Sequence, residues 1–108
     1  MRITKENTIG LIIDIQERLV PAMFEKETLL KNCKVLINGL NELGIQLIVT
    51  QQYTKGLGDT AEEIRDIIPD FNYIEKRDFS CCDEPVFTER LKAAKAENII
   101  ICGIESHV

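Results

Sequence analysis

Short apolar runs alternate along the chain with segments of helical hydrophobic spacing. The runs at residues 9–14, 45–50 and 98–103 are rich in Ile, Val and Leu and end in a polar residue or glycine, as expected for parallel strands buried on both faces. Between the first two runs, apolar residues recur every three or four positions over residues 29–43, which predicts a helix. Gly44 suits the left-handed turn that ends many helices, so the chain begins with strand, helix and strand.

The second half of the chain continues this alternation. Residues 60–63 have the Thr-x-x-Glu spacing of a capping box, which predicts a short helix that ends before Pro69. A weaker strand is expected over residues 73–76, and Asp83 can cap a further helix with one apolar face, formed by Phe87, Leu91 and Ala94. The order β-α-β-α-β-α-β predicts an α/β fold in which helices cover both faces of a parallel sheet.

Composition narrows the class of protein. The 108 residues include 13 Lys and Arg against 18 Asp and Glu, a net charge of −5, and 44% are hydrophobic. We therefore expect one globular domain over residues 1–108 and no nucleic-acid partner, because nucleic-acid binding needs a clustered basic face. The apolar runs are only of strand length and Met1 begins no secretion signal, so we expect a cytoplasmic protein with no membrane partner.

The end of the chain is unusual for this pattern. Val108 comes where a β-α unit normally enters its next helix. A sheet that stops on a strand as apolar as residues 99–102 leaves one face uncovered and one edge exposed. We therefore expect the domain to be incomplete at its C-terminus.

The four cysteines do not indicate a disulfide framework or a zinc site. Cys33 lies on a helical apolar face and Cys102 in an apolar strand, where a thiol behaves as a small hydrophobic group. Cys81 and Cys82 are adjacent and make poor joint ligands, and His107 is the one histidine of the sequence. We expect no metal at these residues.

Three features fall at the carboxyl ends of predicted strands, where open parallel sheets bind ligands. They are Asp14, Lys76 and the turn over residues 103–108. Each has an ordinary structural explanation when taken alone, as a cap, a solvated charge or a turn.

Together with their neighbours, these residues resemble the isochorismatase-like cysteine hydrolases. The resemblance lies in four ordered segments: IIDIQ at 12–16, VTQQY at 49–53, EKRDFS at 75–80 and ICGIESHV at 101–108. It implies a Rossmann-like three-layer α/β/α sandwich, here its first four strands in the order 3-2-1-4. It also implies a catalytic set of Asp, Lys and Cys.

By this resemblance, Asp14 and Lys76 are the catalytic Asp and Lys, and the nucleophilic Cys is expected directly after Val108. None of the four cysteines present matches that position. A nearby ammonium such as Lys76 favours the reactive thiolate, and a carboxylate such as Asp14 can act as general acid and base.

The family also has an oxyanion hole of backbone amides beside a cis peptide bond. Carried over, that bond joins Ile104 to Glu105, and the Glu105 N–H is one donor. Gln16, Phe24 and Gln52 are candidates for the substrate pocket.

The nicotinamidase branch of the family binds a metal through an Asp and histidines after the second strand. Residues 51–54 here contain neither, so no metal and no cofactor are expected.

The sequence therefore favours a cysteine hydrolase that acts on a small amide, ester or vinyl-ether substrate and forms a homo-oligomer. One alternative is a non-catalytic family member that serves as an interaction or oligomer subunit. Another is a flavodoxin-like small-molecule-binding module. A dinucleotide site is disfavoured, because residues 14–18 lack the Gly-x-Gly-x-x-Gly turn.

Overall fold

The computed structural model describes residues 3–76 and 85–104. None of the helices in these ranges is both long enough and apolar enough to cross a membrane. The elements follow one another in the order β1 (Thr8–Ile13), the 3₁₀ turn η1 (Val20–Ala22), α1 (Lys26–Glu42), β2 (Gln46–Gln52), α2 (Thr54–Leu57), α3 (Glu62–Arg65), β3 (Ile74–Lys76), α4 (Pro85–Ala94) and β4 (Asn98–Gly103).

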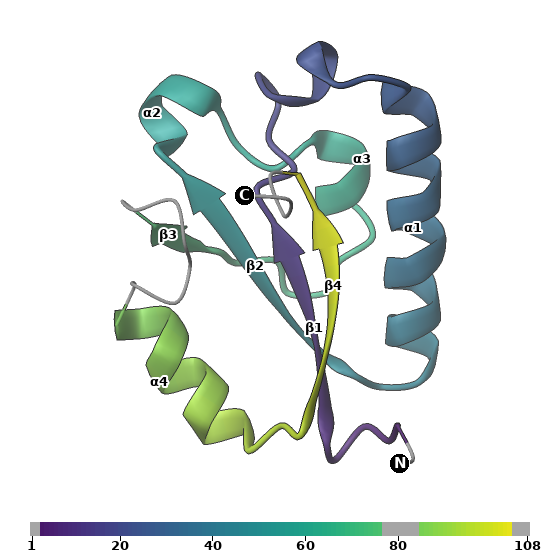
Figure 1. The fold of residues 1–108 in the computed structure, drawn as a ribbon, viewed down its shortest axis with the longest axis vertical. Coiled ribbons are helices and arrows are strands. Elements are labelled where there is room, and N and C mark those ends of the chain that lie inside the picture. Colours follow the sequence, from purple (N-terminus) through teal and green to yellow (C-terminus); the bar gives the residue numbers. More distant parts are fainter. Residues whose placement is uncertain (1–2, 77–84, 105–108) are drawn as a thin grey trace.

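The four strands form one parallel sheet in the order β3-β2-β1-β4 (Figure 1). At its carboxyl end, Ile13 of β1 pairs with Thr50 of β2 on one side and with Gly103 of β4 on the other. Lys76, the last residue of β3, pairs with Gln52. The predicted α/β class and the strand order 3-2-1-4 are confirmed.

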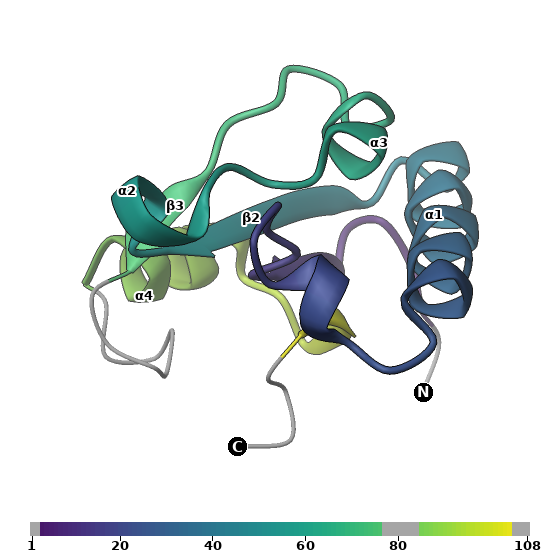
Figure 2. The same cartoon turned by 90° about the horizontal axis from the view of Figure 1, so that it is seen from above.

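Helices cover the two faces of the sheet in separate hydrophobic clusters, and Figure 2 shows α3 and α4 on opposite sides of β2. On one face, Ile12 of β1 packs in the same cluster as Ile37 of α1. On the other face, Leu11 packs with Phe87 of α4, whose side chain is buried as predicted. Because successive strand side chains point to opposite faces, these two clusters form the two cores of a three-layer sandwich.

The predicted capping box at the start of α3 is wrong. Ala61, not Thr60, precedes the helix, and no side chain caps it. The Thr60 hydroxyl instead donates a hydrogen bond of 2.8 Å to Oε1 of Gln51 at the end of β2. This bond to a residue 9 positions earlier takes the group that the local pattern assigned to the cap, and α3 is only 4 residues long. The segment over Thr54–Leu57 forms the short helix α2.

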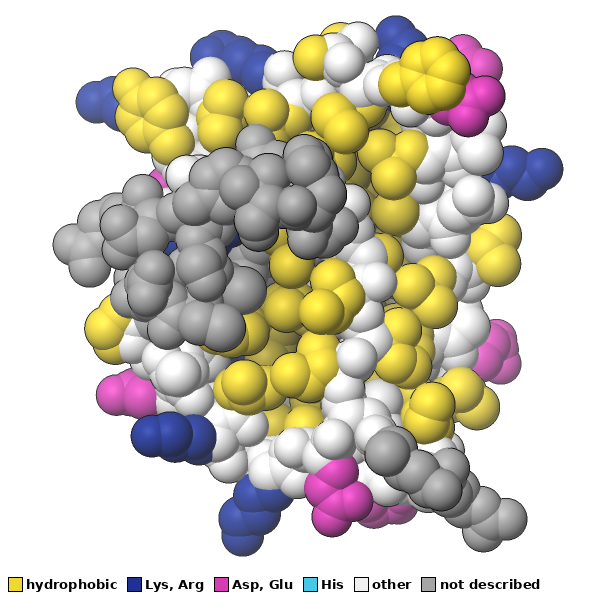
Figure 3. Space-filling view, in the orientation of Figure 1, with side chains coloured by type: hydrophobic (Ala, Val, Ile, Leu, Met, Phe, Trp, Pro, Cys, Tyr) yellow, Lys and Arg dark blue, Asp and Glu magenta, His cyan; other side chains and the backbone are white. Residues whose placement is uncertain are grey.

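Strand β4 forms one edge of the sheet. Within the part of the chain that the structure describes, β4 is the last strand of the sheet on its side. Ile99 and Ile101, on the α4 face, are 43% and 52% exposed. Figure 3 shows hydrophobic side chains gathered over this part of the surface, between α1 and α4.

Candidate active site

Asp14 follows β1 directly and its side chain is fully buried. Its backbone has φ of +52°, a left-handed conformation that costs a residue other than glycine about 1 kcal/mol. Thr50 holds this conformation in two ways. The Asp14 N–H donates to the Thr50 carbonyl oxygen at 3.1 Å, and the Thr50 hydroxyl donates to Asp14 Oδ1 at 2.9 Å. The carboxylate is thus fixed in one orientation at the carboxyl edge of the sheet.

Lys76 reaches Asp14 from the far side of β2. Its Nζ lies 2.8 Å from Asp14 Oδ2, and its side chain is 2% exposed. Strands β3 and β1 are two strand spacings apart, about 10 Å, and the lysine side chain, the 2.8 Å contact and the Asp14 side chain bridge this gap together. The strand order therefore brings together two residues far apart in the sequence.

Burial of the Asp14–Lys76 ion pair is energetically costly. Removing two charges from water costs several kcal/mol for each ion, and only close pairing and further hydrogen bonds offset it. Oδ1 receives the Thr50 hydroxyl, whereas Oδ2 has no partner of hydrogen-bond geometry within the described ranges, although the ammonium is close. Oδ2 of Asp14 therefore retains the capacity to accept a proton from a further group.

Gln16 is fully buried, and its amide ties together the segments that follow β1 and β2. Its Nε2 donates to the carbonyl oxygens of Gln52 and Gly58, at 2.9 and 2.8 Å, and its Oε1 accepts the Gln52 N–H at 2.7 Å. Both of its N–H donors are thus used within the protein. Gln52 is half-buried and held by its main chain. The pocket roles assigned to these two residues remain predictions.

The sequence did not single out three buried polar residues that support the site. Thr50 orients Asp14, as described above. Gln51 and Thr60 are both fully buried, and Gln51 Oε1 accepts the N–H and the hydroxyl of Thr60, each at 2.8 Å. In the sequence, the polar stretch that begins at Thr50, at the end of an apolar strand, indicates a polar site. It does not show which of these side chains are buried.

The remaining predicted site residues are Phe24, Ile104 and Glu105. Phe24 is 89% exposed, so it covers no part of the Asp14–Lys76 pair, and its pocket role remains a prediction. Ile104 is buried, and its N–H donates to the Ile13 carbonyl oxygen at 3.0 Å. This bond holds the start of the turn after β4 beside the end of β1. Glu105, and with it the expected cis bond, lies outside the described residues.

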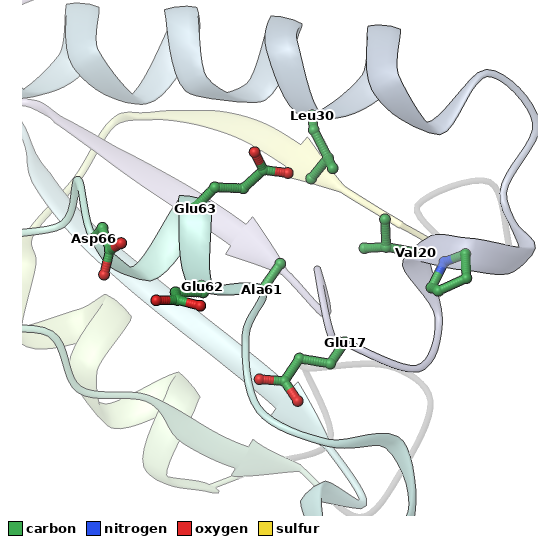
Figure 4. A pocket seen from close by; sticks show the side chains of 8 residues that line it. Glu17, Val20, Leu30, Ala61, Glu62, Glu63 and Asp66 are labelled. Atoms are coloured by element: carbon green, nitrogen blue, oxygen red, sulfur yellow. The ribbon is translucent and has the colours of Figure 1, made fainter.

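A cavity of about 500 Å³ lies between η1, α1 and α3 (Figure 4). Its apolar wall and carboxylate rim consist of Val20, Pro21, Leu30, Ala61, Glu17, Glu62, Glu63 and Asp66. Neither Asp14 nor Lys76 lines it. In residues 3–76 and 85–104, no group of three or more His, Cys, Asp and Glu side chains is arranged to hold a metal ion.

Comparison with known proteins connects this geometry to one family. The isochorismatase domain family model matches residues 8–108. Isochorismatase domain-containing protein 2 of Danio rerio is 30% identical over 105 residues, which cover 97% of this chain and 52% of that protein.

Two solved structures share the fold. A structure described as the MAR1 ribonuclease of Caenorhabditis elegans has a TM-score of 0.89 and 32% identity, over 100% of this chain and 55% of its own. The YcaC gene product of Escherichia coli, described as an octameric hydrolase of unknown specificity, has a TM-score of 0.83 and 23% identity, over 95% of this chain and 52% of its own. The chain thus spans about half the length of these relatives. It belongs to the isochorismatase family.

Proposed function

We propose that the protein containing this chain is a cysteine hydrolase for a small amide, ester or vinyl-ether substrate. Asp14 and Lys76 are two members of its Cys-Asp-Lys triad. The observation that carries this proposal is their buried ion pair, 2.8 Å across, at the carboxyl edge of a parallel sheet. A buried pair contributes little to stability compared with apolar residues of the same volume, so a chemical role accounts better for these two charges.

The third member is a cysteine expected directly after Val108. Support for its place comes from the strand order, because β4 lies next to β1 and the Ile104 N–H is bonded to the Ile13 carbonyl oxygen. A residue a few positions further along this turn can therefore approach Asp14, which immediately follows Ile13. The ammonium of Lys76 would favour the thiolate form of that cysteine.

In the proposed reaction, Asp14 accepts the thiol proton and the sulfur attacks the carbonyl carbon of an amide or ester. Backbone N–H groups, among them that of Glu105, stabilise the oxyanion. Asp14 then passes the proton to the leaving amine or alcohol and afterwards activates the water that hydrolyses the acyl-enzyme. Thr50 is a positioning residue in this scheme, because its hydroxyl holds Oδ1 and leaves Oδ2 facing the reaction.

We propose a small-molecule substrate although one structural neighbour is described as a ribonuclease. The chain carries a net charge of −5, and a carboxylate at the reacting centre would repel phosphates. By analogy with the octameric neighbour, we also propose that the protein forms a homo-oligomer.

The test uses the intact protein with activated esters and amides, such as p-nitrophenyl acetate and p-nitroanilides. Asp14→Asn and Lys76→Met should each lower turnover by about 10²-fold or more, the usual contribution of one acid-base group, while circular dichroism shows that they remain folded. Lys34→Met removes an exposed lysine and serves as the matched control, with unchanged turnover. Folded Asp14→Asn and Lys76→Met variants that both retain turnover would overturn the assignment.

A second measurement does not depend on the choice of substrate. Iodoacetamide alkylates thiolates, so its reaction with the proposed nucleophile should be slower in Lys76→Met than in the unaltered protein. Equal alkylation rates would contradict the role given to the Lys76 ammonium.

A further inference from the structure

Two of the cysteines meet at the packing interface between α1 and β4. Cys33 lies in α1 and is 4% exposed, and Cys102 lies in β4 and packs against the same hydrophobic cluster. A side-chain hydrogen bond between the two thiols is the largest cause of the shift in the pKa of each. We propose that Cys33 and Cys102 form a reversible disulfide that links α1 to β4.

The direction of both side chains follows from the elements themselves. Cys102 pairs in register with Ile12, which faces α1, whereas Ile101 on the same strand points to the opposite face. In α1, Cys33 and Ile37 are one turn apart on the buried side of the helix. The strand alternation and the helical period therefore turn both sulfur atoms into the interface between α1 and β4.

The environment divides the two thiols into an attacking and a resolving partner. The hydrogen bond with Cys102 lowers the pKa of Cys33, an effect that burial only partly opposes. The same hydrogen bond raises the pKa of Cys102, as do burial and the neighbouring charge on Cys33. The thiolate, which is the reactive form, therefore develops on Cys33.

A hydroperoxide supplies the oxidant. The Cys33 thiolate attacks one oxygen of hydrogen peroxide, the O–O bond breaks, and Cys33 becomes a sulfenic acid with release of hydroxide. The Cys102 sulfur then attacks the Cys33 sulfur, the S–O bond breaks, and water leaves with the Cys102 proton. Two thiols are oxidised, one peroxide is reduced, and a dithiol such as dithiothreitol reverses the process.

The disulfide between α1 and β4 would stabilise the folded state. It closes a long loop of the chain, and long loops give large reductions in the entropy of the unfolded state. It also ties β4 to α1 immediately before Gly103 and Ile104, the turn that lies beside Ile13. The oxidised protein should therefore have a Tm about 5–10 °C above that of the reduced protein.

Peptide mapping of the intact protein tests the proposal independently of any hydrolase activity. Trypsin separates the cysteines into peptides 32–34, 78–90 and one that begins at Ala96. After treatment with hydrogen peroxide, or equilibration with excess oxidised dithiothreitol, we expect the first and third peptides to be joined, 2 Da below the sum of their masses. Dithiothreitol should separate them again.

Two variants test which cysteines form the cross-link. Cys81→Ser/Cys82→Ser removes the competing thiols of peptide 78–90 and should retain the cross-link and the rise in Tm. Cys102→Ser, chosen because it alters the less buried member of the pair, should abolish both. The proposal is overturned if, after equilibration with the oxidant, peptide 32–34 is recovered with a free or over-oxidised thiol, or is joined to peptide 78–90. It is also overturned if Cys102→Ser retains the cross-link, since the proposed nucleophile after Val108 lies in the same peptide as Cys102.

Discussion

Replacement of one member of the Asp14–Lys76 pair should leave an uncompensated charge in the protein interior. Asp14 is fully buried and the Lys76 side chain is 2% exposed, so water cannot replace the lost partner. Removing one partner of a buried pair costs about 3–5 kcal/mol. We expect Lys76→Met, which keeps the length of the side chain, and Asp14→Asn, which keeps its shape, each to lower the free energy of unfolding by this amount.

The double variant Asp14→Asn/Lys76→Met should cost much less than the sum of the two single changes. With both charges gone, no isolated ion remains, and an apolar side chain in place of the ammonium can be nearly neutral for stability. A loss of about 2 kcal/mol or less in the double variant, against a sum of about 6–10 kcal/mol, would give a coupling of several kcal/mol. Urea denaturation of all four proteins measures these differences, provided that the m-values agree.

The exposed pair of Lys34 and Glu63 supplies the control for this cycle. Its atoms are 3.5 Å apart and its side chains are 40% and 48% exposed, so Lys34→Met should change the stability by no more than about 1 kcal/mol. The reasoning fails if Lys76→Met costs as little as Lys34→Met. It also fails if the two changes at the buried pair are additive.

Two further predictions concern single residues around the site. Thr50→Val removes the hydroxyl that donates to Asp14 Oδ1, and should cost about 1.5–3 kcal/mol in urea denaturation, as for hydrogen bonds to charged groups, while Thr50→Ser restores most of the loss. An unaffected Thr50→Val protein would show that this hydroxyl does not hold the carboxylate. Gly103→Ala should lower the Tm by 10 °C or more, about 3 kcal/mol or beyond, because its Cβ would lie 2.3 Å from the Ile13 carbonyl oxygen at a φ of +153°. Gly39→Ala in α1 is its control, since nothing lies within 4 Å of the added carbon, and it should stabilise the protein by about 1 kcal/mol. Destabilisation of the same size at both glycines would contradict the steric argument.

The sequence predicted the elements well where local periodicity governs them. The apolar spacing after Leu29 identified α1, and Gly44, with φ of +70°, follows its end as expected. The predicted strand over residues 98–103 is the observed β4. These elements could be read from the chain because buried strands and amphipathic helices repeat their apolar residues with different periods.

The prediction of the capping box was wrong because the polar side chain has its hydrogen-bond partner outside the local segment. Thr60 had the spacing of a helix cap, but the fully buried Gln51 accepts both its N–H and its hydroxyl. The bonds from the Gln16 amide to the main chain of Gln52 and Gly58 were likewise invisible in the sequence, and its pocket role remains a prediction. A local pattern cannot show which distant backbone groups need a donor or an acceptor, because that depends on how the loops meet in space.

By itself, the sequence determined the alternation of strands and helices, the family, and the two candidate residues at strand ends. Taken alone, however, Asp14 resembled a cap and Lys76 a solvated charge. Only the tertiary structure decided that both are buried and 2.8 Å apart, with Thr50 bonded to the carboxylate. The physical reason is that β2 lies between their strands, so the sheet order, the length of the lysine side chain and the loss of surrounding water together turn two separate charges into one site.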